Sequence, residues 1–347
     1  EERRAELVRY ALSENLGSMK KDLKDYGVEF DVWFSEQSLY DSGEFEETMN
    51  YLKDKGLTYE KDGAVWFKAS EFGAEKDEVL IRSNGIPTYF ASDIAYHRNK
   101  FLKRGFDRVI NLLGADHHGH AGRMKAAVKA LGIDPDRLDI VIFQLVRLYR
   151  NGEIVRMSKR KGRAISLADL LEEVGKDAAR FFFNMKASGN HLDFDLDLAV
   201  KQSNENPVFY VQYAHARISS ILRQAQEQGI KLPVIDGLTV DEFQKYANLL
   251  VDESELALIK KLADFPGEVK IAADNLAPYR ITVYSMELAA AFHSFYNKCR
   301  VLTEDENLTA ARLLLVMAAQ QVIKNAFSIL ATSESVSPQA RTLQAHS

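Results

Sequence analysis

The sequence contains a single cysteine, Cys299, among its 347 residues. One thiol cannot form a disulfide within the chain or a zinc site with several thiolate ligands, and this usage is typical of the reducing cytoplasm. No uninterrupted apolar run has the length needed to cross a membrane, and no signal peptide is visible. We therefore expect a soluble, cytoplasmic protein that has no membrane among its partners.

An excess of positive charge is also lacking. The net charge is −5 and the isoelectric point is about 6.0. These values exclude a generally basic nucleic-acid coat, so any contact with nucleic acid must come from local patches. The length is sufficient for two or three domains, and no internal repeat is present. The sequence opens in a charged, helical stretch without an initiator methionine, from which we expect a fragment of a longer protein.

The densest cluster of positive charge lies in residues 156–163, Arg-Met-Ser-Lys-Arg-Lys-Gly-Arg. Like charges this close repel one another unless an anion lies among them. An apolar run of strand type over 139–148 and a hairpin turn at Asn151-Gly152 precede the cluster, and Ser166 can cap a helix after it. A basic loop at the end of a buried strand of an α/β sheet favours phosphate binding over a solvated basic turn.

A second candidate site is the turn at 114–120, between a buried strand at 109–113 and a helix that starts near Met124. Gly114 lets the backbone approach a ligand closely. Asp116, just past a parallel strand, is well placed to accept hydrogen bonds from ribose hydroxyl groups. The turn therefore predicts a nucleotide site.

The same turn also allows a metal site, because it holds four possible ligands in five residues: Asp116, His117, His118 and His120. Adjacent residues rarely all point at one ion, so such a site needs further carboxylates. The available ones are Asp193, Asp195 and Asp197, whose alternation with apolar residues equally fits a half-buried strand or an ordered loop.

Hydrophobic periodicity predicts an α/β first half followed by an all-α helical bundle. In the first half we expect a helix at 5–26, a strand at 28–34, a helix at 44–55, hairpins at 57–68 and 77–90, and a helix at 92–104. In the second half we expect helices at 206–228, 241–262, 266–275, 279–300 and 309–330, with Phe181-Phe182-Phe183 in the core. The polar stretch 332–347 has no period and is expected to be disordered.

Together these features resemble a class I aminoacyl-tRNA synthetase, and more narrowly the bacterial arginyl-tRNA synthetase family. The resemblance covers about residues 29–330 and is carried by segments at 30–34, 63–67, 88–97, 114–119, 156–162 and 206–217. It implies a connective α+β insertion at 1–75, the second half of a Rossmann-type catalytic domain at 76–200, a helical anticodon-binding domain at 201–331 and a disordered tail at 332–347.

The resemblance also implies roles for individual residues. The basic loop matches the Lys-Met-Ser-Lys-Ser signature, so Met157, Ser158 and Lys159 would be catalytic, with Lys159 stabilising charge on the ATP phosphates. The implied ATP-binding residues are Gly114, Asp116, His117, Val146 and Arg160. Tyr89 and Asp93 match the pair that reads the arginine guanidinium, although Asp93 or Ser92 could instead cap the helix. Tyr213 and Tyr296 match aromatics that stack on anticodon bases, and core packing is an equally good interpretation of both.

The chain departs from the family at its start, because the His-Ile-Gly-His type motif of the first half is absent. The resemblance therefore implies an arginine–tRNA ligase fragment that is inactive alone. The implied substrates and partners are ATP with Mg²⁺, L-arginine and tRNA(Arg), with adenylate formation awaiting bound tRNA, no tightly bound metal and a monomeric state. Two alternatives stay open: a metal-dependent phosphohydrolase built on the 116–118 turn, and a non-catalytic tRNA-binding module.

Overall fold

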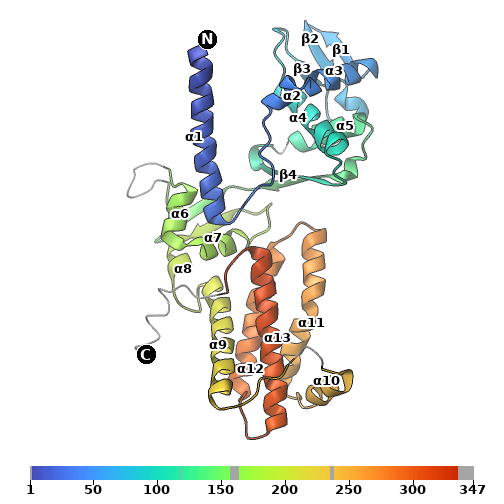
Figure 1. Ribbon diagram of the computed structural model, residues 1–347. Coiled ribbons are helices and arrows are strands. Elements are labelled where there is room, and N and C mark those ends of the chain that lie inside the picture. Colours follow the sequence, from blue (N-terminus) through green and yellow to red (C-terminus); the bar gives the residue numbers. More distant parts are fainter. Residues whose placement is uncertain (1, 118, 157–163, 235–237, 335–347) are drawn as a thin grey trace. The chain divides into compact units, whose positions relative to one another are not determined.

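The computed structural model describes residues 2–117, 119–156, 164–234 and 238–334. The chain divides into two compact units (Figure 1). The α/β unit comprises residues 30–145 and 188–190, and the bundle unit comprises residues 1–29, 146–187 and 191–347.

The α/β unit begins with two helices and a small antiparallel sheet. They are α2 (Gln37–Asp41), α3 (Glu44–Asp54), β1 (Thr58–Lys61), β2 (Ala64–Phe67) and β3 (Glu78–Ile81), with strand order β1-β2-β3. Asp62 and Gly63 both have positive φ, as a type I′ turn between β1 and β2 requires. The expected helix and hairpin of this region are therefore present.

A strand-turn-helix-strand unit follows. Its elements are α4 (Tyr89–Arg98), a π-helical turn (Asn99–Lys103), β4 (Val109–Gly114), a 3₁₀ turn (Ala115–His117), α5 (His120–Ala130) and β5 (Leu138–Phe143). Strands β4 and β5 pair in parallel over six residues. Ile94 from α4, Met124 from α5 and Leu138 from β5 are fully buried in one core. The turn after Gly114 therefore lies at the carboxyl end of a parallel strand, the position where α/β sheets bind ligands.

The bundle unit contains a second small sheet. Its strands are β6 (Val146–Arg150), β7 (Glu153–Ile154) and β8 (Leu192–Asp195), and β6 pairs with β7 antiparallel and with β8 in parallel. Asn151 and Gly152 have positive φ, as predicted for the hairpin turn. The short helices around this sheet are α6 (Leu167–Val174), α7 (Lys176–Phe183) and α8 (Leu196–Val200), and Ser166 caps α6 through a capping box.

Long helices make up the rest of the bundle unit (Figure 1). They are α9 (Pro207–Glu227), α11 (Glu253–Asp274), α12 (Tyr279–Lys298) and α13 (Glu306–Leu330), with the shorter α10 (Val240–Ala247). Phe181, Phe292 and Phe327 are fully buried among them, so Phe181 belongs to the core as expected. Among the described helices, α13 alone is long and apolar enough for a membrane span, and half of its apolar window is buried, as in a core helix.

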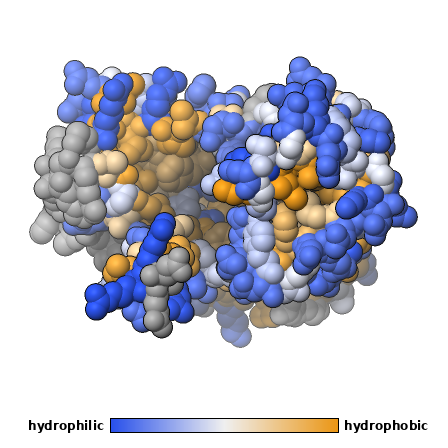
Figure 2. Space-filling model, turned by 90° about the horizontal axis from the view of Figure 1, so that it is seen from above, coloured by the Kyte–Doolittle hydropathy of each residue, from blue (hydrophilic) through white to orange (hydrophobic). Residues whose placement is uncertain are grey.

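The amino-terminal helix α1 (Glu2–Tyr26) leaves much of its apolar surface exposed, including Leu7, Tyr10 and Leu12. Its last turn is the part that packs, since the Tyr26 ring lies edge-on to Phe183 and under the Arg180 guanidinium. Figure 2 shows hydrophobic surface, in orange, between hydrophilic residues on one face of the molecule.

The predicted strand at 28–34 is wrong, and so is the second strand of the predicted hairpin at 77–90. Only β3 forms in that hairpin, Ile81 and Pro87 make an isolated bridge, and residues 89 and 90 already belong to α4. Residues 28–34 form neither a strand nor a helix, and Phe30 and Val32 are 56% and 53% exposed. Alternating apolar residues make a strand only where a neighbouring strand accepts their backbone hydrogen bonds, and no strand pairing is recorded for this segment. Trp33 packs its ring edge-on to Phe30. The other tryptophan, Trp66, lies in β2, so both belong to the α/β unit.

Several helix boundaries also differ from the prediction, and α5 begins at His120 rather than near Met124. Helix α4 begins at Tyr89 rather than Ser92, because the Thr88 side chain accepts a hydrogen bond from the Ala91 N–H and caps it. The expected helix at 241–262 is two helices, since a capping box at Asp252 starts α11 afresh. Pro266 lies inside α11 rather than starting a helix. A proline there removes one hydrogen bond without ending the helix.

Candidate functional site

The two residues predicted to read a guanidinium lie on helix α4. Tyr89 is its first residue and is 81% exposed, and the Asp93 side chain, one turn later, is 40% exposed. A spacing of four residues puts both side chains on one face of the helix. Since Thr88 is the cap, the alternative in which Asp93 or Ser92 caps the helix is wrong.

The Asp93 carboxylate contacts His120, which the sequence offered only as a possible metal ligand and not as a partner of Asp93. His120 Nε2 lies 3.3 Å from Asp93 Oδ2, and the His120 side chain is only 9% exposed. On its other side, Arg123 Nε and Nη2 lie 3.1 and 3.0 Å from His120 Nδ1. His120 is the first residue of α5, so the turn at 114–120 carries a residue that faces Asp93.

A second histidine binds the Asp93 backbone. His97 is buried, its Nδ1 lies 2.7 Å from the Asp93 carbonyl oxygen, and its Nε2 lies 2.7 Å from Nδ2 of Asn111 on β4. A carbonyl oxygen can only accept, so Nδ1 carries the proton and Nε2 accepts from the Asn111 amide. Lys100 completes this group, because its Nζ lies 3.4 Å from Asn111 Oδ1 and 4.1 Å from the Tyr96 ring centroid.

Burial dominates the electrostatics of this region. It raises the pKa of Asp93, with a further contribution from the charge of Glu36. It lowers the pKa of Lys100 to about 8 and the pKa values of His97 and His120 to about 4, so both imidazoles are neutral near pH 7. A carboxylate that has lost solvation gains most from a cation that approaches closely, so the surroundings of Asp93 suit a positively charged ligand.

Two of the three predicted nucleoside-binding residues, Asp116 and His117, share a cavity with His120. Asp116 and His117 line this cavity of about 540 Å³ together with Glu78, His120 and Arg123. A Cβ atom on Gly114 would meet Asp116 Oδ1 at 2.7 Å, so a larger residue at 114 would push the Asp116 carboxylate out of this position. The Asp116 and His117 side chains are 83% and 53% exposed and are free to contact a ligand.

Of the remaining predicted ATP-site residues, the structure describes only Val146. Met157, Ser158, Lys159 and Arg160 lie outside the described residues. Val146 is the first residue of β6 in the bundle unit and is 40% exposed.

Tyr213 and Tyr296, predicted to contact the anticodon, lie together in the bundle unit. They come from α9 and α12, and the Arg217 guanidinium lies 4.8 and 4.5 Å from the two ring centroids. Arg217 also donates a hydrogen bond of 2.8 Å to the Tyr213 hydroxyl. Both rings are therefore partly exposed and partly packed, and Arg217, which the sequence reasoning did not single out, is the group between them.

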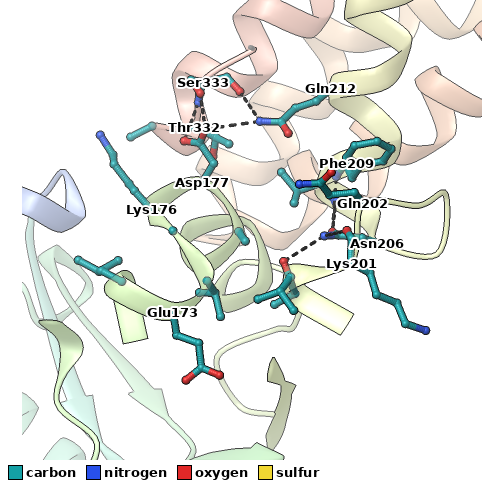
Figure 3. Close-up of a pocket in the computed structure, with 18 of the residues that line it drawn as sticks. Glu173, Lys176, Asp177, Lys201, Gln202, Asn206, Phe209, Gln212, Thr332 and Ser333 are labelled. Atoms are coloured by element: carbon teal, nitrogen blue, oxygen red, sulfur yellow. Dashed lines mark hydrogen bonds between the residues drawn. The ribbon is translucent and has the colours of Figure 1, made fainter. Parts of the chain in front are cut away.

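A larger cavity, of about 900 Å³, lies in the bundle unit among α6, α7, α9 and the end of α13 (Figure 3). Asp177 accepts hydrogen bonds from the Ser333 N–H and from Gln212, and Gln212 also donates to the Ser333 carbonyl oxygen. These bonds join three helices and fix the first residues after α13, where Thr332 is buried. The stretch expected to be disordered is thus ordered as far as Ser333, and 335–347 lie outside the described residues.

The metal alternative gains no support from its carboxylates. Asp193 lies 3.3 Å from Arg147, Asp195 caps α8, and Asp197 accepts a hydrogen bond from the Asn151 N–H. Within the described ranges, which omit His118, no group of three or more histidine, cysteine, aspartate or glutamate side chains is arranged to hold a metal. Each carboxylate has a separate structural role.

Comparison with protein families divides the chain in two. Residues 8–203 match the catalytic domain of the class I (R) tRNA synthetases, and residues 211–334 match the DALR anticodon binding domain. The first match contains Tyr89, Asp93 and the 114–120 turn, and the second contains Tyr213 and Tyr296.

Individual relatives agree with these families. An arginine–tRNA ligase of Acetivibrio thermocellus is 66% identical over 95% of this chain, and one of Ruminiclostridium cellulolyticum is 61% identical over the same share. The chain spans 57% of the length of each. A Campylobacter jejuni protein assigned as an arginyl-tRNA synthetase is 34% identical, with a TM-score of 0.82 over 97% of this chain and 71% of its own. The Thermus thermophilus arginyl-tRNA synthetase, 22% identical, shares the fold with a TM-score of 0.75 over 95% of this chain and 64% of its own.

Proposed function

Because the chain belongs to the class I arginyl-tRNA synthetase family, we propose that it forms part of an arginine–tRNA ligase. In the proposed reaction a carboxylate oxygen of arginine attacks the α-phosphorus of ATP, and pyrophosphate leaves. The arginyl group of the adenylate then passes to the terminal ribose of tRNA(Arg), and AMP leaves. Residues 1–75 would be a connective insertion, 76–200 the second catalytic half and 201–331 the anticodon-binding domain.

The observation that supports this proposal best is the Asp93 carboxylate beside Tyr89. Asp93 has lost part of its solvation, which raises its pKa and increases its gain from a cation. A guanidinium offers planar paired donors to a carboxylate, and a tyrosine can supply a ring face or a hydroxyl group beside it. The side chain of arginine fits this pair better than the point charge of lysine.

On the ATP side, we assign Gly114, Asp116 and His117 to the nucleoside and the backbone near Val146 to the adenine. Met157, Ser158 and Lys159 would act at the phosphates with Arg160, and Lys159 would offset the charge that develops as pyrophosphate leaves. Mg²⁺ would enter with ATP as part of the substrate. We also propose a cytoplasmic monomer.

At the anticodon end, Tyr213, Arg217 and Tyr296 would meet unpaired bases. Aromatic rings and the flat face of a guanidinium both stack on bases without reading their sequence. The packing of Arg217 against both rings supports a single stacking surface rather than two separate contacts.

Asp93→Asn in the full-length gene product that carries this chain tests the assignment. The variant keeps the shape but loses the charge, so we expect the KM for arginine to rise about tenfold or more while the KM for ATP changes less than twofold. ATP–pyrophosphate exchange with tRNA present measures both constants. Asp107→Asn, at a fully exposed aspartate, is the matched control.

An unchanged arginine KM in Asp93→Asn would remove the guanidinium role from this residue. Lys159→Ala should lower kcat in the same assay and leave the arginine KM within a few-fold, because the lysine acts at the phosphates. The chain alone should show no exchange, even with tRNA, and robust exchange by it would contradict the assignment of only half an active site.

A further inference from the structure

We infer that His120 and Arg123 are positioning residues that fix the orientation of the Asp93 carboxylate for a guanidinium ligand. The inference rests on the proposed arginine-binding role of Asp93. It adds two residues to that site and gives each a defined action. Both act through Asp93, and neither needs to touch the substrate.

Arg123 determines which nitrogen of His120 carries the proton. Arg123 Nε and Nη2 both approach His120 Nδ1, at 3.1 and 3.0 Å. A guanidinium has only donors, so Nδ1 must be the accepting, unprotonated nitrogen. In a neutral imidazole the proton is then on Nε2, which lies 3.3 Å from Asp93 Oδ2. Arg123 thereby fixes the tautomer that points an N–H group at Asp93.

Two residues, Glu78 and Phe90, hold Arg123 in place. Its Nη1 lies 3.5 Å from Glu78 Oε2 on β3, and its guanidinium lies 5.2 Å from the ring centroid of Phe90 on α4. Phe90 is buried and also packs edge-on against the His120 ring. The chain of contacts therefore begins and ends on regular elements of the α/β unit, which can hold a side chain more precisely than a loop can.

The His120 imidazole carries no charge near neutral pH. Burial, with the charges of Arg123 and His117, lowers the pKa of His120 to about 4, so the imidazole is neutral near pH 7. A protonated histidine would form an ion pair with Asp93 and compete with a cationic ligand. A neutral N–H group orients the carboxylate and leaves its negative charge for the guanidinium.

The backbone of Asp93 is held by a second histidine, His97. His97 donates from Nδ1 to the Asp93 carbonyl oxygen, so it carries the opposite tautomer to His120. Asp93 is thus held at its main chain by one neutral histidine and at its side chain by the other. An ionised carboxylate has about four acceptor positions, so Asp93 keeps positions on both oxygens for a bidentate fork.

The test compares His120→Leu with His120→Gln in the full-length gene product. Leucine removes the N–H group, so the KM for arginine should rise about tenfold, which is a larger factor than any rise in the KM for ATP. The amide of glutamine can donate to Asp93 and accept from Arg123, so His120→Gln should keep the arginine KM within about threefold of the unchanged protein. Equal arginine KM values in His120→Leu and the unchanged protein, alongside a raised value in Asp93→Asn, would overturn the inference and leave the proposed function intact.

A second measurement does not depend on the reaction. The ¹⁵N chemical shifts of labelled histidine rings distinguish the two tautomers, and we expect Nε2–H for His120 at neutral pH. Arg123→Leu should allow Nδ1–H to appear. A predominant Nδ1–H form in the unchanged protein would overturn the inference whatever the kinetic outcome. If Asp93→Asn leaves the arginine KM unchanged, the guanidinium role fails, and the ring shifts still decide whether His120 presents Nε2–H.

Discussion

At the scale of single residues, the bundle unit contains a fully buried carboxylate. The Glu255 side chain is 0% exposed and lies 2.7 Å from Arg312 Nε, while its other oxygen accepts a hydrogen bond from the Asp252 N–H at the start of α11. Arg312 also donates to the Arg300 carbonyl oxygen. A buried charge is tolerated when it is paired with an opposite charge and hydrogen-bonded in this way.

Glu255→Gln should therefore destabilise the bundle unit by about 3 kcal/mol, because it leaves the Arg312 charge buried without its counter-charge. Urea unfolding followed by circular dichroism measures the change. Asp274→Asn breaks an exposed pair with Lys270 and should cost less than about 1 kcal/mol. Similar losses of unfolding free energy in the two variants would show that burial does not determine how much the Glu255–Arg312 pair contributes to stability.

At the scale of elements, the start of α9 depends on one side chain. Asn206 is buried, accepts hydrogen bonds from the N–H groups of Val208 and Phe209, and donates through Nδ2 to the carbonyl oxygens of Ala199 and Lys201. It therefore caps α9 and also ties the end of α8 to it. Pro207 suits the first helical position because its missing N–H group would have no partner there.

Asn206→Ala should cost about 2 kcal/mol or more, since it removes the cap and leaves two carbonyl groups without a donor. Thr239→Ala removes a cap of the same kind from the exposed helix α10 and should cost about 1 kcal/mol. The difference between the urea midpoints of the two variants measures what the Asn206 hydrogen bonds to α8 add to stability. Equal shifts would mean that Asn206 stabilises the fold through the helix cap alone.

These elements also show how much of the fold and of the site can be predicted from the sequence. The start of α9 is predictable to the residue because Asn-Pro and a long apolar period agree there. Residues 28–34 have a strand period, but pairing is a tertiary property that the period does not contain. At the site, the family motifs identify Tyr89 and Asp93. His120 meets Asp93, and Arg123 bonds to His120, only because α4 packs on α5, which no spacing along the chain expresses.

At the scale of the whole molecule, acid should weaken the fold through its neutral histidines. His97 and His120 have pKa values of about 4 in the folded α/β unit, against 6.5 for an exposed histidine. Between these values the unfolded chain binds more protons, so stability falls as the pH falls from about 6.5 to about 4. Each histidine contributes roughly 3 kcal/mol above this window, at 1.36 kcal/mol per pKa unit.

The midpoint of urea unfolding should therefore fall steeply on acidification, and His97→Gln should make the dependence shallower as well as lowering stability at pH 7. His191→Gln, at an exposed histidine, should leave the slope unchanged. If the urea midpoint of His97→Gln falls with pH as steeply as that of the unchanged protein, His97 is not a source of the pH dependence.

The two tryptophans provide the chain with a built-in optical reporter. Trp33 and Trp66 are the only ones in the sequence, and both belong to the α/β unit, whereas the long helices α1, α9, α11, α12 and α13 belong to the bundle unit. Indole emission therefore follows the unfolding of the α/β unit, and the helical ellipticity is dominated by the bundle unit. One unlabelled sample, observed at both signals during the same titration, yields a separate unfolding curve for each half of the chain.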